Sequence, residues 1–433
     1  MFKEMTVRDL ARVVQTRNGR SDRELVRGVS IDSRTVCPGE VFFALKGDNT
    51  DGHLYVRRAR ARGAVAAVVS QAQGEKYEIL VKDPLYALGE LGSFYRAQFH
   101  PVVIGITGTN GKTTVKNILA RLLQIKYRVR STWKNYNSLI GLPLTLLRLT
   151  GKEDFLVLEM GTNHPGEIAR LREISRPQIG VITNVGPGHL TGFGSVDGVR
   201  REKMTLLEDL PAHGFGVAGD GVYQDCPAPG DQPVSGNIIR FSLNDATDIV
   251  LTETGSRFRY RTDEYFTPLL GLGNVYNCLA ALTVAVRLGL EPAKLGMVLA
   301  NLLPETGRME PIRRGNLLII NDTYNANPLS MKTALDFIAG RKRRRVLILG
   351  DMKEMGTGSA AQHQAIGAYA RARGDLILTV GDEAASYGGR HFTEPARLVD
   401  VLMEELFGDE VILVKASRSL RFEKIVMEIL RRI

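Results

Sequence analysis

Short apolar runs alternate with polar turns along most of the chain, and this pattern predicts its secondary structure. Apolar runs of about four to eight residues, bounded by turn residues, predict buried strands, and longer amphipathic stretches between them predict helices. Strands and helices in alternation predict an α/β protein built on parallel sheets. The runs that predict strands are 41–45, 64–69, 79–81, 102–104, 155–158, 179–183, 215–218, 317–320, 346–349, 376–380 and 411–414.

Two breaks divide this alternation into three parts. The first falls near His100-Pro101 and the second at 303–308. The stretch 225–268 departs from the alternation, because it holds several prolines and short β-like runs, and it predicts a small antiparallel insertion in the central part. A long helix is predicted over 274–288. The predicted domains are residues 1–98, 99–308 and 309–433.

Charge leaves two classes of partner open. The 433 residues carry 57 Lys and Arg against 47 Asp and Glu, a net charge of +10, which suits either binding to nucleic acid or a membrane surface, or phosphorylated, anionic substrates. The densest basic run, 341–345, precedes a predicted strand and is expected to be a solvated loop edge. The sequence has no basic stripe interleaved with aromatic residues, which disfavours nucleic acid.

Membrane segments and disulfides are not expected. The apolar runs are too short to cross a bilayer, and residues 1–14 carry charges throughout, which predicts an amphipathic helix and no signal peptide. Cys37, Cys226 and Cys278 are odd in number and far apart. This favours reduced thiols in a cytoplasm-like compartment over a disulfide framework or a zinc site.

The most informative motif is GITGTNGKTT at 105–114, which follows an apolar run and precedes a helix-like stretch. A strand, a glycine-rich turn and a helix in this order form a phosphate cradle, because backbone N–H groups curl around an anion at the positive end of the helix. Lys112 would place its charge against the outer phosphates, and the Thr113 hydroxyl could ligate Mg²⁺. The common phosphate-loop pattern has a glycine where this chain has Ile106, so the match to that pattern is partial.

Several polar residues near the ends of predicted strands are candidates for the same chemistry. Glu159 could hold Mg²⁺ or cap the turn that follows it. His189 lies in a glycine-proline turn after another strand, where a neutral imidazole could serve a second metal ion. By spacing alone, Lys203 is a charged helix position. Asn274 and Asn277 fall on the first turn of a predicted helix, where capping is the alternative to binding.

Three polar loops follow predicted strands of the C-terminal part, at 321–328, 350–356 and 415–418. Since parallel strands share a carboxyl edge, we expect these loops to converge on one rim. The first loop, NDTYNANP, is too densely polar for a plain turn and is interpreted as lining a site. Arg308, at the second break, could reach across an interdomain cleft to phosphate.

Together these residues resemble the Mur ligase family of ATP-dependent amide-forming enzymes, over nearly the whole chain from Ser30 to Glu423. The form GTNGKTT at 108–114 is typical of that family, which accounts for the departure at Ile106. Within the family the chain is most similar to the enzymes that join D-alanyl-D-alanine to UDP-N-acetylmuramoyl-tripeptide. The stretches that carry this similarity are SIDSR at 30–34, FFAL at 42–45, NYN at 135–137, IGLP at 140–143, NDTYNANP at 321–328, and GDM at 350–352 with Glu354.

The resemblance implies three α/β domains: one that binds the UDP-linked substrate, a central doubly wound ATPase domain, and a Rossmann-like C-terminal domain. It implies ATP, two Mg²⁺ ions and a carbamylated Lys203, because a carbamate would be an anionic Mg²⁺ ligand. The residues that it assigns to ATP are Gly108, Thr109, Asn110, Gly111, Lys112, Thr113, Thr114, Asn274, Arg308 and Asp322. Those assigned to Mg²⁺ are Thr113, Glu159, His189 and Lys203, and those assigned to catalysis are Lys112, His189 and Lys203. Those assigned to the UDP-linked substrate or the dipeptide are Ser30, Ser33, Arg34, Asn135, Asn137, Asn325 and Asn327.

The implied activity is ligation through an acyl phosphate, which would give UDP-N-acetylmuramoyl-pentapeptide for peptidoglycan and the cell wall. The expected partners are the UDP-linked tripeptide and D-alanyl-D-alanine, with no nucleic acid and no membrane insertion, for a cytoplasmic monomer. Two alternatives stay open. One is a sibling ligase that adds a different amino acid, against which Asn325-Ala326-Asn327 argues. The other is a basic phosphate-loop ATPase that binds nucleic acid.

A few positions depart from the family's pattern. Met204-Thr205 stand where a glycine-glutamate pair is common, Gly273 where a histidine is common, Ala416 in place of a glycine and Phe422 in place of a methionine. None of these departures removes a group that phosphoryl transfer needs.

Overall fold

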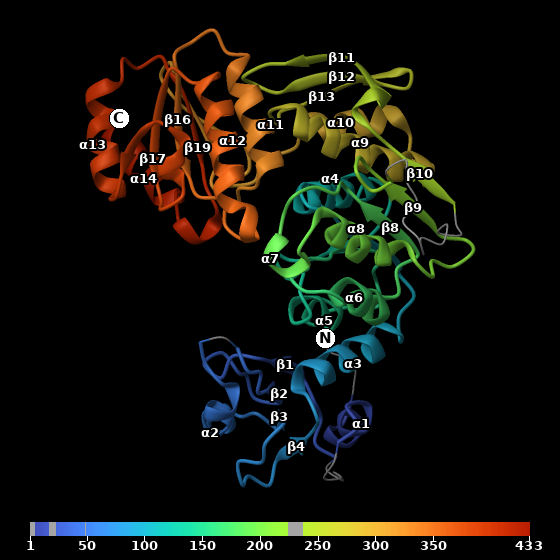
Figure 1. Cartoon of the computed structure of the whole chain (residues 1–433). Helices are drawn as coiled ribbons and strands as arrows, with labels where there is room; N and C mark the ends of the chain where they lie inside the picture. The colour runs from blue at the N-terminus through green and yellow to red at the C-terminus, as the bar shows by residue number, and fades with distance from the viewer. Residues whose placement is uncertain (1–4, 17–22, 48, 224–236) are drawn as a thin grey trace.

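The computed structural model describes residues 5–16, 23–47, 49–223 and 237–433, and its main sheets form three spatial units (Figure 1). We name them the N-terminal, central and C-terminal units, after the sheet at the core of each. The central unit lies between the other two in the chain and carries the contacts to both. This architecture confirms the predicted α/β fold with three domains, whereas the residues at which the domains end stay a prediction.

The N-terminal unit is a parallel sheet in the order β1-β2-β3-β4. Its strands are apolar on both faces, so that Val41 and Phe43 pack into one cluster while Phe42 packs into another. Helix α3 begins after the Asp83 cap and lies against α5 and α6 of the central unit, where both units share one apolar cluster. The elements are β1 (Gly28–Ser30), β2 (Glu40–Phe43), β3 (Ala66–Val69), β4 (Glu78–Leu80), α1 (Val7–Val13), α2 (Val56–Ala61) and α3 (Pro84–Arg96).

The central unit is a six-stranded parallel sheet in the order β10-β9-β8-β5-β7-β6. The chain winds to one side of β5 through β6 and β7, and to the other side through β8, β9 and β10. The carboxyl end of β5 is therefore the switch point at which such sheets bind ligands. The elements are β5 (Val102–Thr107), β6 (Val129–Ser131), β7 (Phe155–Glu159), β8 (Ile179–Ile182), β9 (Phe215–Ala218), β10 (Ile238–Arg240), α4 (Lys112–Leu123), α5 (Gly141–Leu146), α6 (Glu167–Ser175), α7 (Leu190–Phe193), α8 (Val196–Met204), α9 (Leu272–Arg287) and α10 (Pro292–Ala300).

The predicted antiparallel insertion is present but shorter than expected. Strands β11 (Ala246–Leu251), β12 (Ser256–Tyr260) and β13 (Asp263–Thr267) form an antiparallel sheet that packs on α9 and α10. The prediction is wrong for β10, which extends the main sheet in parallel with β9. Three residues are too few for their pattern to reveal a partner. The prolines of 227–233 lie outside the described residues.

The C-terminal unit is a six-stranded sheet in the order β14-β15-β19-β16-β17-β18, parallel except for β14. The polar edge strand β14 was not predicted, because an edge strand faces solvent and tolerates proline, so it lacks an apolar run. The elements are β14 (Glu310–Arg314), β15 (Leu317–Asp322), β16 (Arg345–Gly350), β17 (Leu376–Val380), β18 (Arg390–Phe392), β19 (Val411–Lys415), α11 (Pro328–Ala339), α12 (Ser359–Arg371), α13 (Pro395–Glu405) and α14 (Glu423–Arg432).

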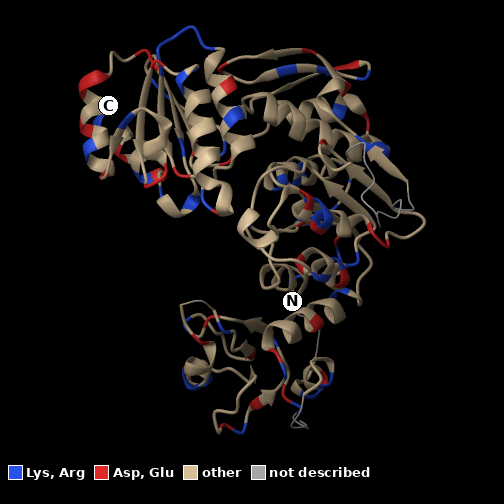
Figure 2. Cartoon of the chain, in the orientation of Figure 1, with Lys and Arg blue, Asp and Glu red and all other residues tan. Residues whose placement is uncertain are grey.

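The basic run 341–345 is not the solvated loop edge that its composition predicts. Arg343 pairs with Glu253 of the insertion at 2.9 Å, and Arg345 pairs with Asp375 of its own unit at 2.6 Å. Figure 2 shows basic and acidic residues intermixed along all three units. The excess of basic residues therefore does not gather into a charged stripe on the ribbon, and part of the densest run joins two parts of the fold.

The described residues bear on two further predictions. Within them, no helix combines the length and the apolar character that crossing a membrane requires. Cys37 is exposed and Cys278 is buried in α9, and both are free thiols, whereas Cys226 lies outside the described residues.

Candidate active site

The phosphate loop lies at the carboxyl end of β5, and two glycines shape it. Gly108 has a φ of 150° and Gly111 a φ of 81°, and Gly111 directly precedes α4. A Cβ atom on Gly108 would overlap Thr183 Oγ1, and one on Gly111 would overlap Asn277 Oδ1. Glycine therefore allows the chain to turn tightly into α4, whose N-terminus is the positive end of a helix dipole.

Thr183 and Asn184, which follow strand β8, hold the loop in place. The sequence alone assigned no role to either residue. Asn184 Oδ1 accepts the Asn110 N–H at 3.0 Å, and the Asn184 carbonyl accepts the Thr109 N–H at 2.9 Å. The Thr183 hydroxyl donates to the Asn110 carbonyl at 2.5 Å. A sequence signal for them exists, since both are polar and lie at the end of a predicted strand, Thr183 as its last residue and Asn184 directly after it.

Lys112 begins α4, and its side chain folds back over the phosphate loop. Its Nζ donates to the carbonyls of Gly108, at 2.7 Å, and Thr109, at 3.3 Å. Burial lowers the pKa of Lys112, while the nearby Glu159 carboxylate acts in the opposite direction. An anion in the loop would offer this ammonium a stronger partner than neutral carbonyls do. The position suits the predicted role at the outer phosphates.

Glu159 ends β7 and is buried with one carboxylate oxygen unused. Its Oε1 accepts from Asn137 Nδ2 at 2.7 Å, whereas Oε2 has no hydrogen-bond partner in the described part of the chain. The Lys116 ammonium lies 4.0 Å from Oε2 and donates to the Thr132 carbonyl at 3.0 Å. Neither oxygen caps the following turn, so that alternative is wrong. A buried carboxylate oxygen that accepts no hydrogen bond from the described residues fits a cation ligand.

Lys203 of α8 is 1% exposed, so its interpretation as an ordinary charged helix position is wrong. Burial holds the pKa of Lys203 well below the usual range for lysine, and repulsion by Lys112 adds to this shift. Glu202 is engaged elsewhere, since it accepts the N–H groups of Gly166 and Ile168 at 2.8 Å each. Lys203 is therefore a buried amine whose charged form is destabilised.

His189 directly precedes α7 and meets a carboxylate of the C-terminal unit. Its Nδ1 lies 2.6 Å from Oε2 of Glu354. Both residues have left-handed backbone conformations, with φ values of 54° and 65°. The contact with His189 lowers the pKa of Glu354, although burial opposes this shift. The role of His189 as a metal ligand stays a prediction.

Arg308 follows α10 in the connection to the C-terminal unit and reaches back to the start of α4. Its NH2 group donates to Thr113 Oγ1 at 3.0 Å, and its guanidinium lies 3.7 Å from the centre of the Tyr324 ring. Its Nε lies 3.3 Å from Glu305 Oε2. Arg308 therefore stands at the phosphate loop, and its contact with a nucleotide stays a prediction.

The three polar loops of the C-terminal unit converge, as expected, at the carboxyl edge of its sheet. Lys415 Nζ donates to Asp322 Oδ2 at 2.6 Å and to the Asn325 carbonyl at 2.9 Å. The Ser417 N–H donates to the Asp351 carbonyl at 3.1 Å. The rim joins the ends of β15, β16 and β19 because parallel strands share this edge.

Asn327 joins this rim to the phosphate loop. Its Oδ1 accepts the Ser330 N–H at 2.9 Å and so caps α11. The same amide exchanges two hydrogen bonds with the Asn110 side chain, at 2.7 and 3.2 Å. Asn325 is exposed, and its Oδ1 accepts the N–H of Ala326 at 2.8 Å. The contacts of both asparagines with the dipeptide stay predictions.

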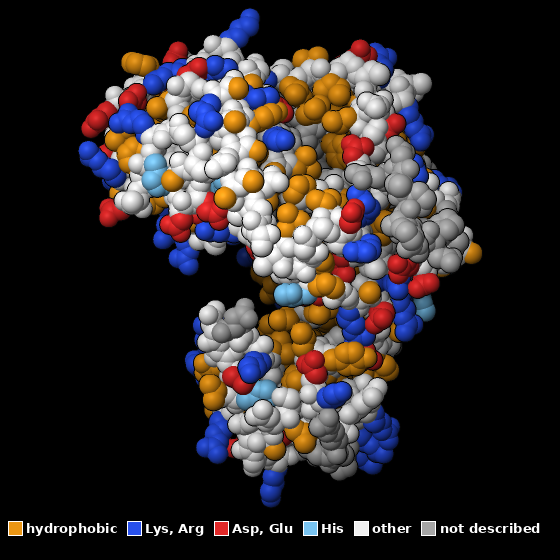
Figure 3. All heavy atoms as spheres, in the orientation of Figure 1, with side chains coloured by type: hydrophobic (Ala, Val, Ile, Leu, Met, Phe, Trp, Pro, Cys, Tyr) orange, Lys and Arg blue, Asp and Glu red, His pale blue; other side chains and the backbone are white. Residues whose placement is uncertain are grey.

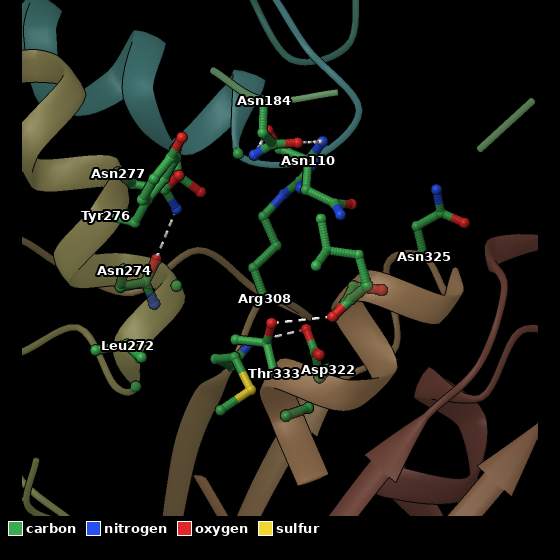
Figure 4. A pocket seen from close by; sticks show the side chains of 18 of the residues that line it. Asn110, Asn184, Leu272, Asn274, Tyr276, Asn277, Arg308, Asp322, Asn325 and Thr333 are labelled. Atoms are coloured by element: carbon green, nitrogen blue, oxygen red, sulfur yellow. Dashed lines mark hydrogen bonds between the residues drawn. The ribbon is translucent and has the colours of Figure 1, made fainter. Parts of the chain in front are cut away.

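A pocket of about 380 Å³ opens between the central and C-terminal units beside these groups (Figure 4). Arg308 extends across its middle, with Asn274 and Asn277 on one side and Asp322 on the C-terminal unit. An apolar pocket with a few amide groups, next to a phosphate loop, suits a nucleoside. The apolar part of its lining includes Leu270, Leu272, Tyr276, Met309 and Leu329.

Asn274 and Asn277 lie near the start of α9, and neither caps it. Asn277 Nδ2 donates to Asn274 Oδ1 at 3.1 Å, and Asn274 Nδ2 donates to the Leu270 carbonyl at 2.9 Å. The N-cap position is Gly271, which has no side chain to accept a backbone N–H. The capping alternative is therefore wrong, and both residues line the pocket.

The residues assigned to the UDP-linked substrate do not line this pocket. Ser30, Ser33 and Arg34 belong to the N-terminal unit, where the Arg34 guanidinium lowers the pKa of Asp32 to about 2. Asn135 lies in the loop between β6 and α5. Figure 3 shows the surface hollowed between the N-terminal and C-terminal units. The structure does not gather these residues in one place, and their roles stay predictions.

Mg²⁺ would need ligands from a substrate as well as from the protein. The described residues contain no group of three or more His, Cys, Asp or Glu side chains that could hold a metal ion. Mg²⁺ is commonly held by one or two carboxylates together with phosphate oxygens and waters. Glu159, with its unused oxygen beside the phosphate loop, fits this mode.

Comparison with known proteins decides the family. The chain matches the family descriptions "Mur ligase family, catalytic domain" at 25–105, "Mur ligase middle domain" at 106–285 and "Mur ligase, glutamate ligase domain" at 307–418. It is 37% identical over 424 residues to the UDP-N-acetylmuramoyl-tripeptide–D-alanyl-D-alanine ligase of Escherichia coli (strain K12), with 92% of each chain covered. The chain belongs to the Mur ligase family.

Other Mur ligases agree in sequence and structure. The ligase of the same name from Bacillus subtilis (strain 168) is 32% identical, with 98% of each chain covered. A crystal structure of MurF from Acinetobacter baumannii matches with a TM-score of 0.92 at 28% identity, covering 99% of each chain. MurF from Thermotoga maritima in complex with ADP matches with a TM-score of 0.85 at 28% identity, covering 93% of this chain and 97% of that one. These likenesses confirm the resemblance and the three-domain Mur ligase fold.

Proposed function

We propose that this Mur ligase uses ATP to join D-alanyl-D-alanine to UDP-N-acetylmuramoyl-tripeptide, giving UDP-N-acetylmuramoyl-pentapeptide for peptidoglycan synthesis. Relatives named for this reaction match over nearly their whole length, which supports the proposal. The observation that carries the chemistry is the phosphate loop. On one side it has a buried carboxylate oxygen of Glu159 that has no hydrogen-bond partner in the described residues, and on the other a nucleoside-sized pocket.

ATP would bind with its phosphates at the loop 108–114 and its nucleoside in the adjoining pocket. Lys112 would contact the outer phosphates, and Arg308 would approach them from the connection between the units. Thr113 and Glu159 would hold Mg²⁺ together with phosphate oxygens. The ion would supply positive charge that offsets the repulsion between a carboxylate and the γ-phosphate.

Two chemical steps would follow, and the protein would promote both chiefly by positioning. The terminal carboxylate oxygen of the tripeptide attacks the γ-phosphorus and the bond to ADP breaks, which gives an acyl phosphate. The amine nitrogen of D-alanyl-D-alanine then attacks the acyl carbon, the bond to phosphate breaks, and the nitrogen loses a proton. Lys112 and Arg308 would reduce the repulsion between the anions of the first step. The C-terminal unit would cover the acyl phosphate against water.

Lys203 would carry a carbamate and would contribute to a second Mg²⁺ site. A neutral amine reacts with carbon dioxide to give a carbamate and a proton, and burial holds the pKa of Lys203 well below its usual range. The carbamate would put an anionic ligand in the place of a buried amine. His189 would share the second ion after it separates from Glu354, with which it is now in contact.

The UDP part of the substrate would bind to the N-terminal unit through Ser30, Ser33 and Arg34. The hollow between the N-terminal and C-terminal units would admit it (Figure 3). Family matches that end at 105 and begin at 307 lie near the predicted domain ends at 98 and 308, which supports these boundaries. A cytoplasmic location and a monomeric state stay predictions.

Phosphate release by the purified protein tests the proposal, with ATP and Mg²⁺ present and one further substrate left out at a time. We expect release that needs both the UDP-linked tripeptide and D-alanyl-D-alanine, with the pentapeptide product seen by mass. The variant Lys112→Ala should release phosphate at least about a hundredfold more slowly, because the charge at the phosphates is lost, whereas Lys152→Ala, an exposed lysine, should match the wild type.

Other outcomes have distinct meanings. Release with the tripeptide and a different amine would assign the chain to a sibling activity of the family. Release that DNA or RNA stimulates would favour a nucleic-acid-dependent ATPase. Unchanged release by Lys112→Ala would contradict the assignment of the phosphate loop.

A further inference from the structure

Glu354 is a carboxylate of the C-terminal unit that lies at the phosphate loop and takes no part in the steps described above. Its Oε2 is 2.6 Å from His189 Nδ1, and the Thr191 N–H donates to its carbonyl at 3.5 Å. The positive φ of Glu354, 65°, is costly for a residue with a side chain and persists only where the surrounding structure imposes it. The protein therefore holds the backbone at Glu354 in a defined conformation, and the carboxylate rests against His189.

The loop that carries Glu354 is held by buried groups. Asp351, 0% exposed, accepts the Ala384 N–H at 2.8 Å. The next residue, Met352, donates its N–H to Nε2 of His363, which is also 0% exposed, at 2.9 Å. The two residues thus tie the start of the loop to the interior of the C-terminal unit. Any movement of this unit toward the central unit would carry the start of this loop, and with it Glu354, in the same direction.

Glu354 is an accessible anion in a cationic neighbourhood. Two carboxylates act on the charge of Lys112, namely those of Glu159 and Glu354. The Glu159 side chain is 3% exposed and adjoins Lys116, whereas the Glu354 side chain is 55% exposed. Arg308 stands at the start of α4. Of the two carboxylates that act on Lys112, Glu354 is therefore the one that an approaching cationic substrate can reach.

We propose that Glu354 binds the ammonium group of the incoming D-alanyl-D-alanine, an inference that rests on the proposed function. The amine is a cation in neutral solution, and the lysine and arginine around the phosphate loop repel it. A carboxylate on the C-terminal unit attracts it and places it beside the acyl phosphate when the units close. In the structure without substrate, Glu354 rests on His189. Binding of the dipeptide exchanges this contact for the ammonium.

The variant Glu354→Gln tests the inference, because the amide keeps the size and one acceptor but loses the charge. We expect the KM for D-alanyl-D-alanine to rise about tenfold or more, as a charge-assisted contact is lost. The KM values for ATP and for the UDP-linked tripeptide should change less than about twofold. The matched control is Glu404→Gln, an exposed glutamate of α13, which should leave all three KM values unchanged.

A partial reaction separates binding of the dipeptide from assembly of the site. ATP and the UDP-linked tripeptide alone form the acyl phosphate reversibly, which scrambles ¹⁸O between the bridging and non-bridging positions of the β,γ-linkage. Glu354→Gln should scramble at a rate within about threefold of the wild type. An equal loss of scrambling and of ligation would show that Glu354 acts only in assembling the site, and would overturn the proposal.

A neutral isostere of the dipeptide provides a readout that a structural role would not change. D-lactoyl-D-alanine has a hydroxyl in place of the ammonium, and its competition against D-alanyl-D-alanine measures recognition of the charge. The preference of the wild type for the dipeptide should fall about tenfold or more in Glu354→Gln. An unchanged preference and an unchanged dipeptide KM would overturn the inference while leaving the proposed function intact. If the wild type itself fails to ligate D-alanyl-D-alanine, the proposed function fails.

Discussion

Buried ionisable residues give the site its character at the scale of single residues. Lys116 lies one helical turn after Lys112 and is 2% exposed, because this face of α4 packs on the sheet. Burial lowers the pKa of Lys116, and the Glu159 carboxylate acts in the opposite direction. Lys203 is as deeply enclosed, and its pKa lies well below the usual range although the Glu202 carboxylate acts in the opposite direction. Its charged form is therefore disfavoured, which suits modification of the amine.

Replacement of Lys203 by alanine tests whether modification turns this residue into an anionic Mg²⁺ ligand. Lys203→Ala should lose at least about a hundredfold in ligation rate, because an anionic Mg²⁺ ligand would be missing. Formate or acetate should restore part of the rate by occupying the vacated space as a carboxylate. Phosphate release measured against carboxylate concentration checks both expectations.

The control for that rescue is Lys112, which would act as a cation, whereas modified Lys203 would act as an anion. Lys112→Ala lacks a cation at the phosphates, so small carboxylates should not restore its activity. Full activity of Lys203→Ala without any added carboxylate would remove Lys203 from the site.

Loops at the carboxyl ends of parallel strands position the site at the scale of elements. In the loop after β16, burial alone would raise the pKa of Asp351, but hydrogen bonds from the Lys353 ammonium and the Ala384 N–H outweigh it and the pKa is lowered. The folded protein thus binds fewer protons at Asp351 than the unfolded chain does. Its contribution to stability is present above the ordinary aspartate pKa of 3.8 and is lost as the pH falls below that value.

The variant Asp351→Asn should therefore differ from the wild type mainly at neutral pH. We expect its free energy of unfolding to be lower by about 1.5–3 kcal/mol there, since hydrogen bonds to a charged acceptor are lost. The difference should shrink as the pH is lowered through 3.8. Melting temperatures measured between neutral and acid pH check this, with the exposed Asp409→Asn as control. A difference that stays constant with pH would contradict the assigned ionisation.

Two separate sets of contacts dock the C-terminal unit on the central unit at the scale of the whole molecule. One set lies at the phosphate loop, where Asn327 pairs with Asn110. The other lies at the insertion, where Glu253 accepts from Arg343 at 2.9 Å and Arg313 at 3.4 Å. The first set uses groups that a nucleotide would engage, whereas the second is independent of it. The second set is thus suited to keep the units together while the first is exchanged for substrates.

Removal of the charge at Glu253 should loosen this docking. In Glu253→Gln, loss of the partly exposed ion pairs should weaken the docking of the two units by about 1 kcal/mol or less. The radius of gyration of the nucleotide-free protein should increase, and a protease should cleave the connection at 303–308 several-fold faster. Small-angle scattering and limited proteolysis measure the two effects, and ADP should reduce both.

The insertion itself offers the control for this prediction. Asp248 pairs with Arg259 of the same small sheet at 3.1 Å, so Asp248→Asn removes a similar exposed pair without touching the C-terminal unit. Equal behaviour of the two variants would show that the Glu253 contacts do not hold the units together.

Local sequence patterns were sufficient to predict much of this fold and part of the site. The apolar runs predicted the parallel strands at the cores of the three sheets, because a strand that is buried on both faces needs several consecutive apolar residues. The phosphate loop was predicted for the same reason, since its chemistry lies within 105–114. The short or polar strands β1, β6, β10, β14 and β18 were not, because edge strands need no apolar run.

The sequence by itself determined the order of the buried strands, the position of the phosphate loop, and the convergence of polar loops at one edge of the C-terminal sheet. These follow from periodicity and turn chemistry within short segments. Only the tertiary structure decided that Lys203 is buried, that Glu354 faces His189, and that part of the basic run 341–345 binds the insertion. Each of these depends on residues far apart in the chain, since burial and pairing of a charge are set by what packs against it.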